Sequence, residues 1–105
     1  PRAWGTFPRI MGRLRRRHGY PVEQLVQRLA QNPARRFGLA ERGEIKEGYR
    51  ADICIFDPEM INDLSSFEDP MMHPIGIPHV LVNGQLVVED SECTGIMSGE
   101  GIKAI

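Results

Sequence analysis

Side chains that could bind a metal ion occur between residues 69 and 79. Asp69, His73 and His79 carry suitable donor atoms, and zinc in proteins takes three or four such ligands. The two histidines are six residues apart, which matches neither an HxH nor an HExxH arrangement. Prolines at positions 70, 74 and 78 also interrupt the segment. We therefore expect structural or surface roles for these side chains and no metal site in this chain.

Three other side chains have the chemistry needed for catalysis. Asp52 and Asp57 are a pair of carboxylates, but an odd spacing within a predicted strand places them on opposite faces. We expect both to accept hydrogen bonds from turn and backbone groups. Cys54 stands in an apolar run and is expected to be a small buried hydrophobe, because a nucleophilic thiolate needs an accessible, electropositive setting. The sequence therefore predicts no catalytic residue.

Arginine is concentrated in the first third of the chain. Residues 1–36 contain nine arginines and one acidic residue, a charge of +8, whereas the remainder carries −9. The cluster Arg13, Arg15, Arg16 and Arg17 could contact phosphates, so a basic nucleic-acid-binding module is an alternative function. No base-reading motif or interleaved aromatic residue accompanies this cluster. The same division of charge would also suit two layers of one protein that face one another.

The composition is typical of a folded chain. Of 105 residues, 41% are hydrophobic and 26% are charged, which suits one small domain or part of a larger one. No run approaches the roughly 20 apolar residues of a membrane span, and the first residues lack the apolar stretch of a signal peptide. Cys54 and Cys93 are therefore expected to stay reduced, which predicts a cytoplasmic location. Because the first residue is Pro1 rather than methionine, we expect a piece of a longer protein.

The spacing of apolar residues predicts helices over residues 10–18 and 21–32, after a loop over residues 1–8. The apolar positions that recur at helical intervals are Ile10, Met11 and Leu14 in the first and Val22, Leu25, Val26 and Leu29 in the second. Gly19 is expected to end the first helix, and Asn32-Pro33 to break the second. Residues 33–38 then predict a separate single turn.

After residue 40 the pattern changes to short β runs. Residues 43–45 and 51–56 predict two strands joined by a turn at Gly48. The second run is apolar without alternation, which predicts a central strand covered on both faces. Residues 59–78 are rich in proline and predict a long crossing loop, with one helical turn around residues 63–67.

The strongest local signal is a hairpin. Asn83-Gly84 lies between the apolar runs 80–82 and 85–88, and a two-residue turn of type I′ needs positive φ at both positions. We expect the two arms to pair in register. The glycine-containing tail after residue 90 is expected to add a last edge strand.

Two longer motifs resemble the C-terminal signature of the amidohydrolase superfamily. They are GEIKEGYRADICIFDP at residues 43–58 and VLVNGQLVV at residues 80–88. Three shorter stretches resemble N-acyl-D-amino-acid deacylases in particular, namely PRAWGTFPR at 1–9, PARRFGL at 33–39 and SFEDP at 66–70. Together the motifs cover nearly the whole chain in the expected order, so the chain resembles the C-terminal piece of such an enzyme.

The resemblance implies an α+β chain that belongs to a larger fold. Deacylases of this kind are expected to combine a (β/α)8 barrel, which carries the metal, with a small β-sandwich built from both chain termini. Residues 1–40 would then hold two to three helices that remain from the last βα unit of the barrel. Residues 41–105 would form a small antiparallel sheet, the C-terminal share of the sandwich. The missing N-terminal part of the parent chain is the expected partner, with no membrane and no nucleic acid.

The implied reaction is hydrolysis of the amide of an N-acyl-D-amino acid by a zinc-activated water. The ligands of the zinc are expected upstream of Pro1, so the cofactor belongs to the parent enzyme and none is expected in this chain. The isolated chain is accordingly expected to be inactive. A purely structural or interaction fragment is the third alternative function.

The resemblance also places the N-terminal segment at the catalytic mouth, because active-site loops in a barrel follow its strands. Five side chains become candidates for lining the substrate: Arg2, Trp4, Thr6, Phe7 and Arg9. An arginine can hold a substrate carboxylate through paired hydrogen bonds, and the two aromatic rings could wall an apolar acyl group. The alternative is that the rings only pack this segment onto the first helix.

Overall fold

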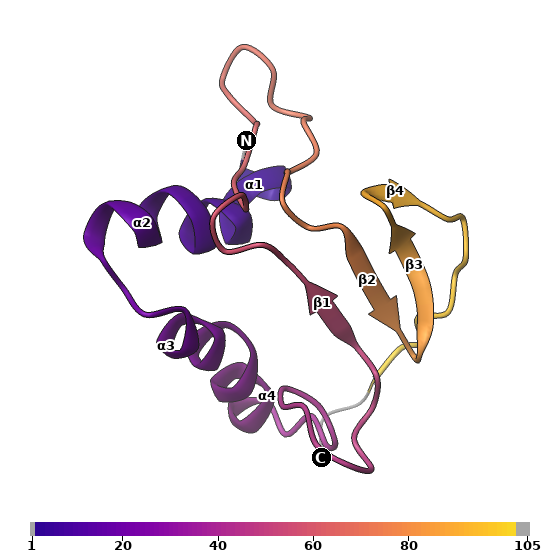
Figure 1. Cartoon of the computed structure of the whole chain (residues 1–105). Coiled ribbons are helices and arrows are strands. Elements are labelled where there is room, and N and C mark those ends of the chain that lie inside the picture. The colour runs from indigo at the N-terminus through magenta and orange to yellow at the C-terminus, as the bar shows by residue number, and fades with distance from the viewer. Residues whose placement is uncertain (1, 103–105) are drawn as a thin grey trace.

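Two helical arms lie beside a four-stranded antiparallel sheet (Figure 1). The computed structural model describes the backbone of residues 2–102 and the side chains of residues 5–102. The α+β class expected from the sequence is confirmed. Each arm is one unbroken helical run in which a π-helical segment lies between two α-helical ones.

The first arm consists of α1 (Arg2–Arg9), the π-helical segment η1 (Ile10–Leu14) and α2 (Arg15–His18). It ends at Gly19, whose φ of 70° confirms the predicted helix end. The loop predicted for residues 1–8 is wrong. Gly5 and Pro8 lie inside α1 although both are poor helix formers, because close packing of Gly5 against Asp63 outweighs these local preferences.

The second arm consists of α3 (Val22–Val26), the π-helical segment η2 (Gln27–Gln31) and α4 (Asn32–Arg36). The break predicted at Asn32-Pro33 is wrong, since the helical run continues to Arg36. Pro33 stands at the first turn of α4, directly after the wider turns of η2, where its missing N–H and its ring are tolerated. Gly38, with φ of 66°, closes the arm as predicted.

The sheet has the order β1-β2-β3-β4, with β1 (Ile53–Ile55), β2 (His79–Val82), β3 (Gln85–Glu89) and β4 (Glu92–Cys93). The predicted hairpin and the last edge strand are confirmed. The hairpin arms are not fully in register, because a β-bulge between Val80 and Leu81 leaves Val87 without an opposite residue.

Two predictions about the first strands are wrong. Residues 43–45 form no strand, and the side chain of Ile45 is 87% exposed. β1 is an edge strand rather than a central one, because β2 flanks it on one side and the described part of the chain supplies no strand on the other. The predicted turn at Gly48 is confirmed, with φ of 82° and a hydrogen bond from Tyr49 N to Lys46 O.

Residues 56–78, which we call the crossing loop, connect β1 to β2 and pass over the first arm (Figure 1). A bridge between Asn62 and Ile75 closes the projecting part of this loop. The helical turn predicted around residues 63–67 is absent from the structure. Asp63 is instead buried against Gly5 of α1.

The buried core is small and joins the two arms to the crossing loop. Met11, Leu25 and Ile61 are its buried members, and the partly buried residues packed against it are Ile10, Val22, Leu29, Phe56 and Ile77. Large apolar side chains such as Phe67, 93% exposed, remain on the surface. The core therefore leaves many large apolar side chains of the described residues outside it.

Replacing Gly84 by valine is expected to destabilise the chain by about 1 kcal/mol or more. Asn83 and Gly84 have φ of 49° and 76°, and a β-branched side chain is strained in that conformation. The measurement is a urea unfolding midpoint. Gln85→Val, an exposed change to a strand-favouring residue next to the turn, serves as the control. An unchanged midpoint for Gly84→Val would count against this turn.

Candidate functional site

A buried carboxylate lies where α1 meets the crossing loop. The side chain of Asp63 is 1% exposed, and its Oδ2 accepts a hydrogen bond from Nε of Arg9 at 3.0 Å. Nη2 of Arg9 is 2.8 Å from the same oxygen. The second oxygen, Oδ1, has no hydrogen-bond partner among the side chains described and lies 3.6 Å from Nη2 of Arg13. We call Arg9, Arg13 and Asp63 the Asp63 cluster.

Further polar contacts fix the crossing loop onto the first arm. The guanidinium of Arg15 donates to the carbonyls of Met11 and Pro58, and Arg16 donates to the carbonyls of Pro58 and Ile61 at 3.0 Å each. These contacts account for most of the arginine cluster noted in the sequence. The basic helix is therefore used inside the chain, which argues against the alternative of a nucleic-acid-binding module.

The five substrate-lining candidates divide between different surfaces. Thr6 and Arg9, three residues apart in α1, line a groove of about 420 Å³ together with Gly5, Ile10, Leu14, Asp63 and Phe67. Phe7 is 63% exposed and lines a separate hollow. The side chains of Arg2 and Trp4 lie outside the described residues. The structure thus places Thr6 and Arg9 in one groove and Phe7 in a separate hollow.

The hollow that Phe7 lines is mainly apolar and lies between the arms and the sheet. It measures about 350 Å³, and its apolar walls include Met11, Val26, Leu29, Ile53, Phe56, Ile61 and Ile77. Cys54 also lines it, with an exposed side chain, which corrects the expectation that this residue is buried. Its strand is at the sheet edge, and no described strand pairs with the free side of that edge. Desolvation by the protein atoms nearby still raises the pKa of the Cys54 thiol, which disfavours a nucleophilic thiolate.

The model of the amidohydrolase family matches residues 1–88. The chain belongs to this family. Among its relatives, the D-aminoacylase of Alcaligenes xylosoxydans xylosoxydans is 43% identical over 100 residues, which are 94% of this chain and 21% of the relative. The chain therefore spans about a fifth of the length of this curated relative.

Solved structures of amidohydrolases contain the same fold. A D-aminoacylase studied for the role of its binuclear metal centre matches with a TM-score of 0.88 and 45% identity, over 91% of this chain and 20% of that one. The N-acyl-D-glutamate deacylase of Bordetella bronchiseptica, in complex with zinc and a phosphonate inhibitor, matches with a TM-score of 0.81 and 43% identity. That match covers 83% of this chain and 19% of the deacylase. The resemblance to N-acyl-D-amino-acid deacylases is thereby confirmed.

The described residues of this amidohydrolase chain form no metal site of their own. Within residues 2–102, no three His, Cys, Asp or Glu side chains are close enough together to hold an ion. His79 is occupied locally, because its Nδ1 accepts a hydrogen bond from Asp90 N at 3.4 Å. Asp52 and Asp57 accept hydrogen bonds from the backbone N–H groups of Asn83 and Glu59, each at 2.9 Å, which confirms the structural roles expected for them.

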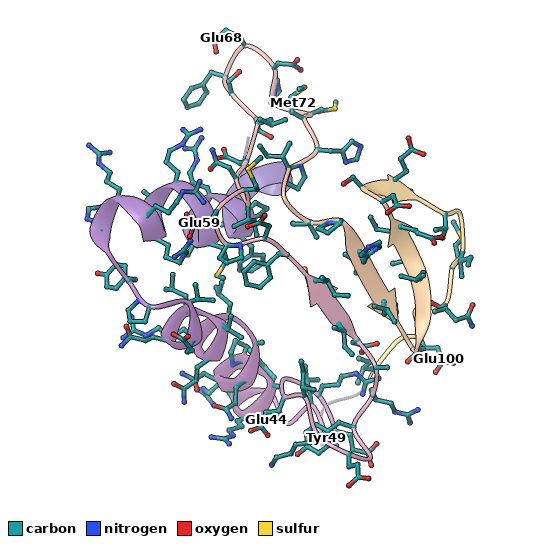
Figure 2. The ribbon with its side chains drawn as sticks, viewed as in Figure 1. Glu44, Tyr49, Glu59, Glu68, Met72 and Glu100 are labelled. Carbon is teal, nitrogen blue, oxygen red and sulfur yellow. The ribbon has the colours of Figure 1, made fainter. Side chains whose placement is uncertain are left out.

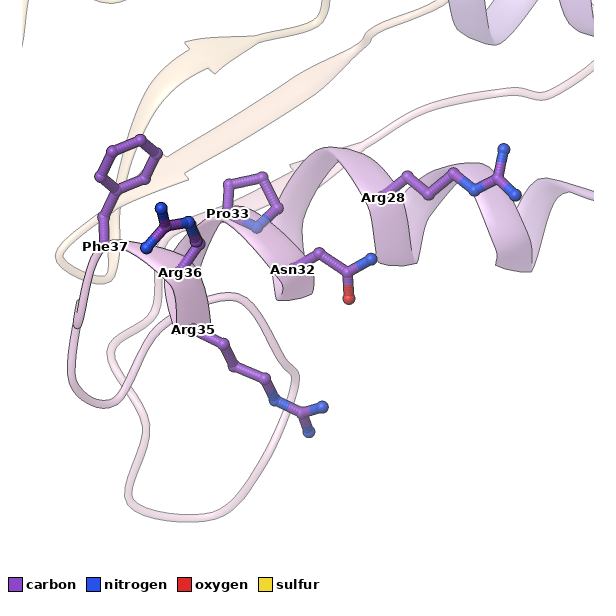
Figure 3. A pocket seen from close by; sticks show the side chains of 6 residues that line it. All are labelled: Arg28, Asn32, Pro33, Arg35, Arg36 and Phe37. Carbon is purple, nitrogen blue, oxygen red and sulfur yellow. The ribbon is translucent and has the colours of Figure 1, made fainter.

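A second groove, of about 660 Å³, runs along the second arm (Figure 3). Its lining residues are Arg28, Asn32, Pro33, Arg35, Arg36 and Phe37. Arg35 is 3.6 Å from Glu44, and Figure 3 shows the guanidinium groups of Arg28 and Arg35 pointing in different directions. A hydrogen bond from Gln31, helped by Lys46 and Arg35, lowers the pKa of Glu44. These arginines do not converge on one anion.

None of the helices within residues 2–102 is long and apolar enough to cross a membrane.

Sequence reasoning missed Asp63, the most buried of the large side chains. The sequence predicted only a helical turn around residues 63–67 and gave Asp63 no buried role, because acidic side chains are rarely fully buried. The one available signal was the opposite charge of the two chain segments, since the arginine-rich first arm needs acidic partners elsewhere. That signal predicts pairing between the segments but does not select Asp63.

Proposed function

We propose that this chain is the C-terminal portion of a metal-dependent amidohydrolase that hydrolyses the amide of N-acyl-D-amino acids. The observation that carries the proposal is the 43% identity to a D-aminoacylase over 94% of this chain. Fold agreement with D-aminoacylase structures at a TM-score of 0.88 supports it. The zinc of the proposed enzyme would be held by residues outside this chain, since those described here form no metal site.

Features of the sheet support the barrel and sandwich context of the proposal. β1 is apolar along its length, lies at the sheet edge and is partly exposed, as expected for a strand that pairs with a segment from elsewhere in the parent protein. We accordingly propose residues 1–40 as part of the barrel layer and residues 41–105 as part of the sandwich. The cytoplasmic location stays a prediction from the sequence.

We further propose that the N-terminal segment contributes to substrate binding. α1 begins at Arg2, and the amino end of a helix that follows a barrel strand faces the catalytic mouth. The sequence predicts Arg2, Trp4, Thr6, Phe7 and Arg9 as lining residues, and we propose the first four as substrate contacts. Because the structure engages Arg9 with Asp63, its role is better described as holding the segment than as contacting substrate directly.

A chimera tests the proposed function. The matching region of the Alcaligenes D-aminoacylase is replaced by these 105 residues, and hydrolysis of an N-acetyl-D-amino acid is compared with that of its L enantiomer. We expect chelator-sensitive hydrolysis of the D enantiomer, because 43% identity over 100 residues preserves the interface with the rest of the enzyme. A matched chimera that carries the corresponding region of the Rubrobacter xylanophilus allantoinase, which is 36% identical to this chain over 86 residues, controls for the disturbance caused by replacement. A folded, metal-loaded chimera without activity would refute the proposal.

A further inference from the structure

We propose that Asp63 is a positioning residue, which sets the orientation of the N-terminal turn of α1 for substrate binding. This inference rests on the proposed function. It concerns a residue of the crossing loop that is 54 positions from Arg9 in the sequence. The juxtaposition comes from the fold alone, because the loop passes over the first arm between β1 and β2 (Figure 1).

Burying the charge of Asp63 has a cost in hydration. A carboxylate that is 1% exposed loses most of its hydration, and an apolar side chain of similar size would fill the same place without that loss. The Asp63 cluster recovers part of the cost through one short, paired contact with Arg9. A buried ion pair thus adds little net folding stability, but it strongly constrains the geometry of its two side chains.

The contact between Arg9 and Asp63 has a precise geometry. Nε and Nη2 of Arg9 both approach one oxygen of Asp63, at 3.0 and 2.8 Å, which fixes the rotation of the guanidinium. Gly5 lies one helical turn before Arg9, and a Cβ placed there would be 2.8 Å from Cβ of Asp63. Asp63 therefore contacts two successive turns of α1, and these turns carry the proposed substrate-lining side chains.

Contacts on both sides of Asp63 anchor the crossing loop. The next residue toward the N-terminus, Asn62, accepts a hydrogen bond from the backbone of Arg13 at 3.3 Å and pairs with Ile75. Ser65 is also buried and donates to the carbonyl of Met72. Asp63 is held between two anchored positions, whereas Glu68 and Met72 lie on the part of the loop that projects beyond α1 (Figure 2).

The test uses the active chimera with Asp63→Asn, which keeps the shape of the side chain and removes its charge. We expect KM for the N-acetyl-D-amino acid to rise about tenfold with kcat changed less than about twofold, because a misplaced binding segment weakens ground and transition states equally. Glu59→Gln, an exposed acid of the same loop, serves as the control and should change neither constant (Figure 2). All assays are run well below the thermal midpoint of each variant.

Arg9→Lys keeps the charge but loses the paired contact, so KM should rise in the same direction even if Asp63→Asn fails to fold. Combining Arg9→Lys with Asp63→Asn should raise KM little beyond the larger single effect, since both remove one contact. Unchanged KM in a folded Asp63→Asn chimera would overturn the inference while leaving the proposed function intact. An unmodified chimera that is folded and inactive would refute the proposed function and this inference with it.

Discussion

Replacing Gly12 by alanine is expected to destabilise the chain by about 3 kcal/mol. A Cβ at this position would lie 1.9 Å from the carbonyl oxygen of Ile61 and 3.0 Å from Cα of Asn62. Both are backbone atoms, so no side-chain rotation relieves the overlap. The first arm must therefore move away from the crossing loop, which loosens Met11 and Ile61 in the core.

The sign of this effect makes the test discriminating. Glycine to alanine within a helix ordinarily stabilises it by up to about 1 kcal/mol, so helix propensity alone predicts the opposite result. The measurement is the urea midpoint of the 105-residue chain, with the slope of the transition checked for change. Gly101→Ala, which meets no atom within 4 Å, should leave the midpoint unaltered. A stabilised Gly12→Ala chain would show that the arm and the loop do not pack as described.

Replacing Arg9 by methionine is expected to cost on the order of 3 kcal/mol of folding stability. Methionine keeps much of the apolar stem but, among the described side chains, leaves Arg13 as the remaining cation beside the buried Asp63 carboxylate, at 3.6 Å. Asp63→Asn should cost clearly less, because Arg9 is 42% exposed and water can solvate its freed charge. The larger loss thus comes from removing the more exposed partner.

Thermal or urea unfolding of both variants measures this asymmetry. Arg17→Met is the matched control, since Arg17 is an exposed arginine of the same arm, and its loss should stay within about 0.5 kcal/mol. Equal losses for Arg9→Met and Arg17→Met would mean that the Asp63 cluster does not form in solution.

Local patterns were sufficient to predict the elements that local chemistry determines. Asn83-Gly84 selects its turn because both residues accept positive φ, and Gly19 ends the first arm for the same reason. The apolar spacing of Val22, Leu25 and Leu29 identified the second arm because one face of that helix packs against the core. The motifs at residues 43–58 and 80–88 were specific enough to indicate the family that the comparisons then showed.

Predictions failed where distant contacts outweigh local preference. Gly5 and Pro8 both disfavour a helix, so the local sequence does not predict the start of α1. The packing of α1 against Asp63 cannot be predicted from residues 1–8 alone. β1 has the composition of a central strand, but the described part of the chain pairs it on one edge. Such a mismatch is expected of a strand that pairs with a segment outside the described residues, and this chain spans about a fifth of the length of its D-aminoacylase relative.

The most direct test of the account compares the chimera with the isolated 105-residue chain at equal molar concentration, both supplied with zinc, on one N-acetyl-D-amino acid. We expect the chimera to release the free D-amino acid and the isolated chain to release none, because no three metal-binding side chains come together among the described residues of the isolated chain. Turnover by the purified isolated chain, or a folded chimera without turnover, would contradict the proposal that this chain is the C-terminal portion of an amidohydrolase acting on N-acyl-D-amino acids.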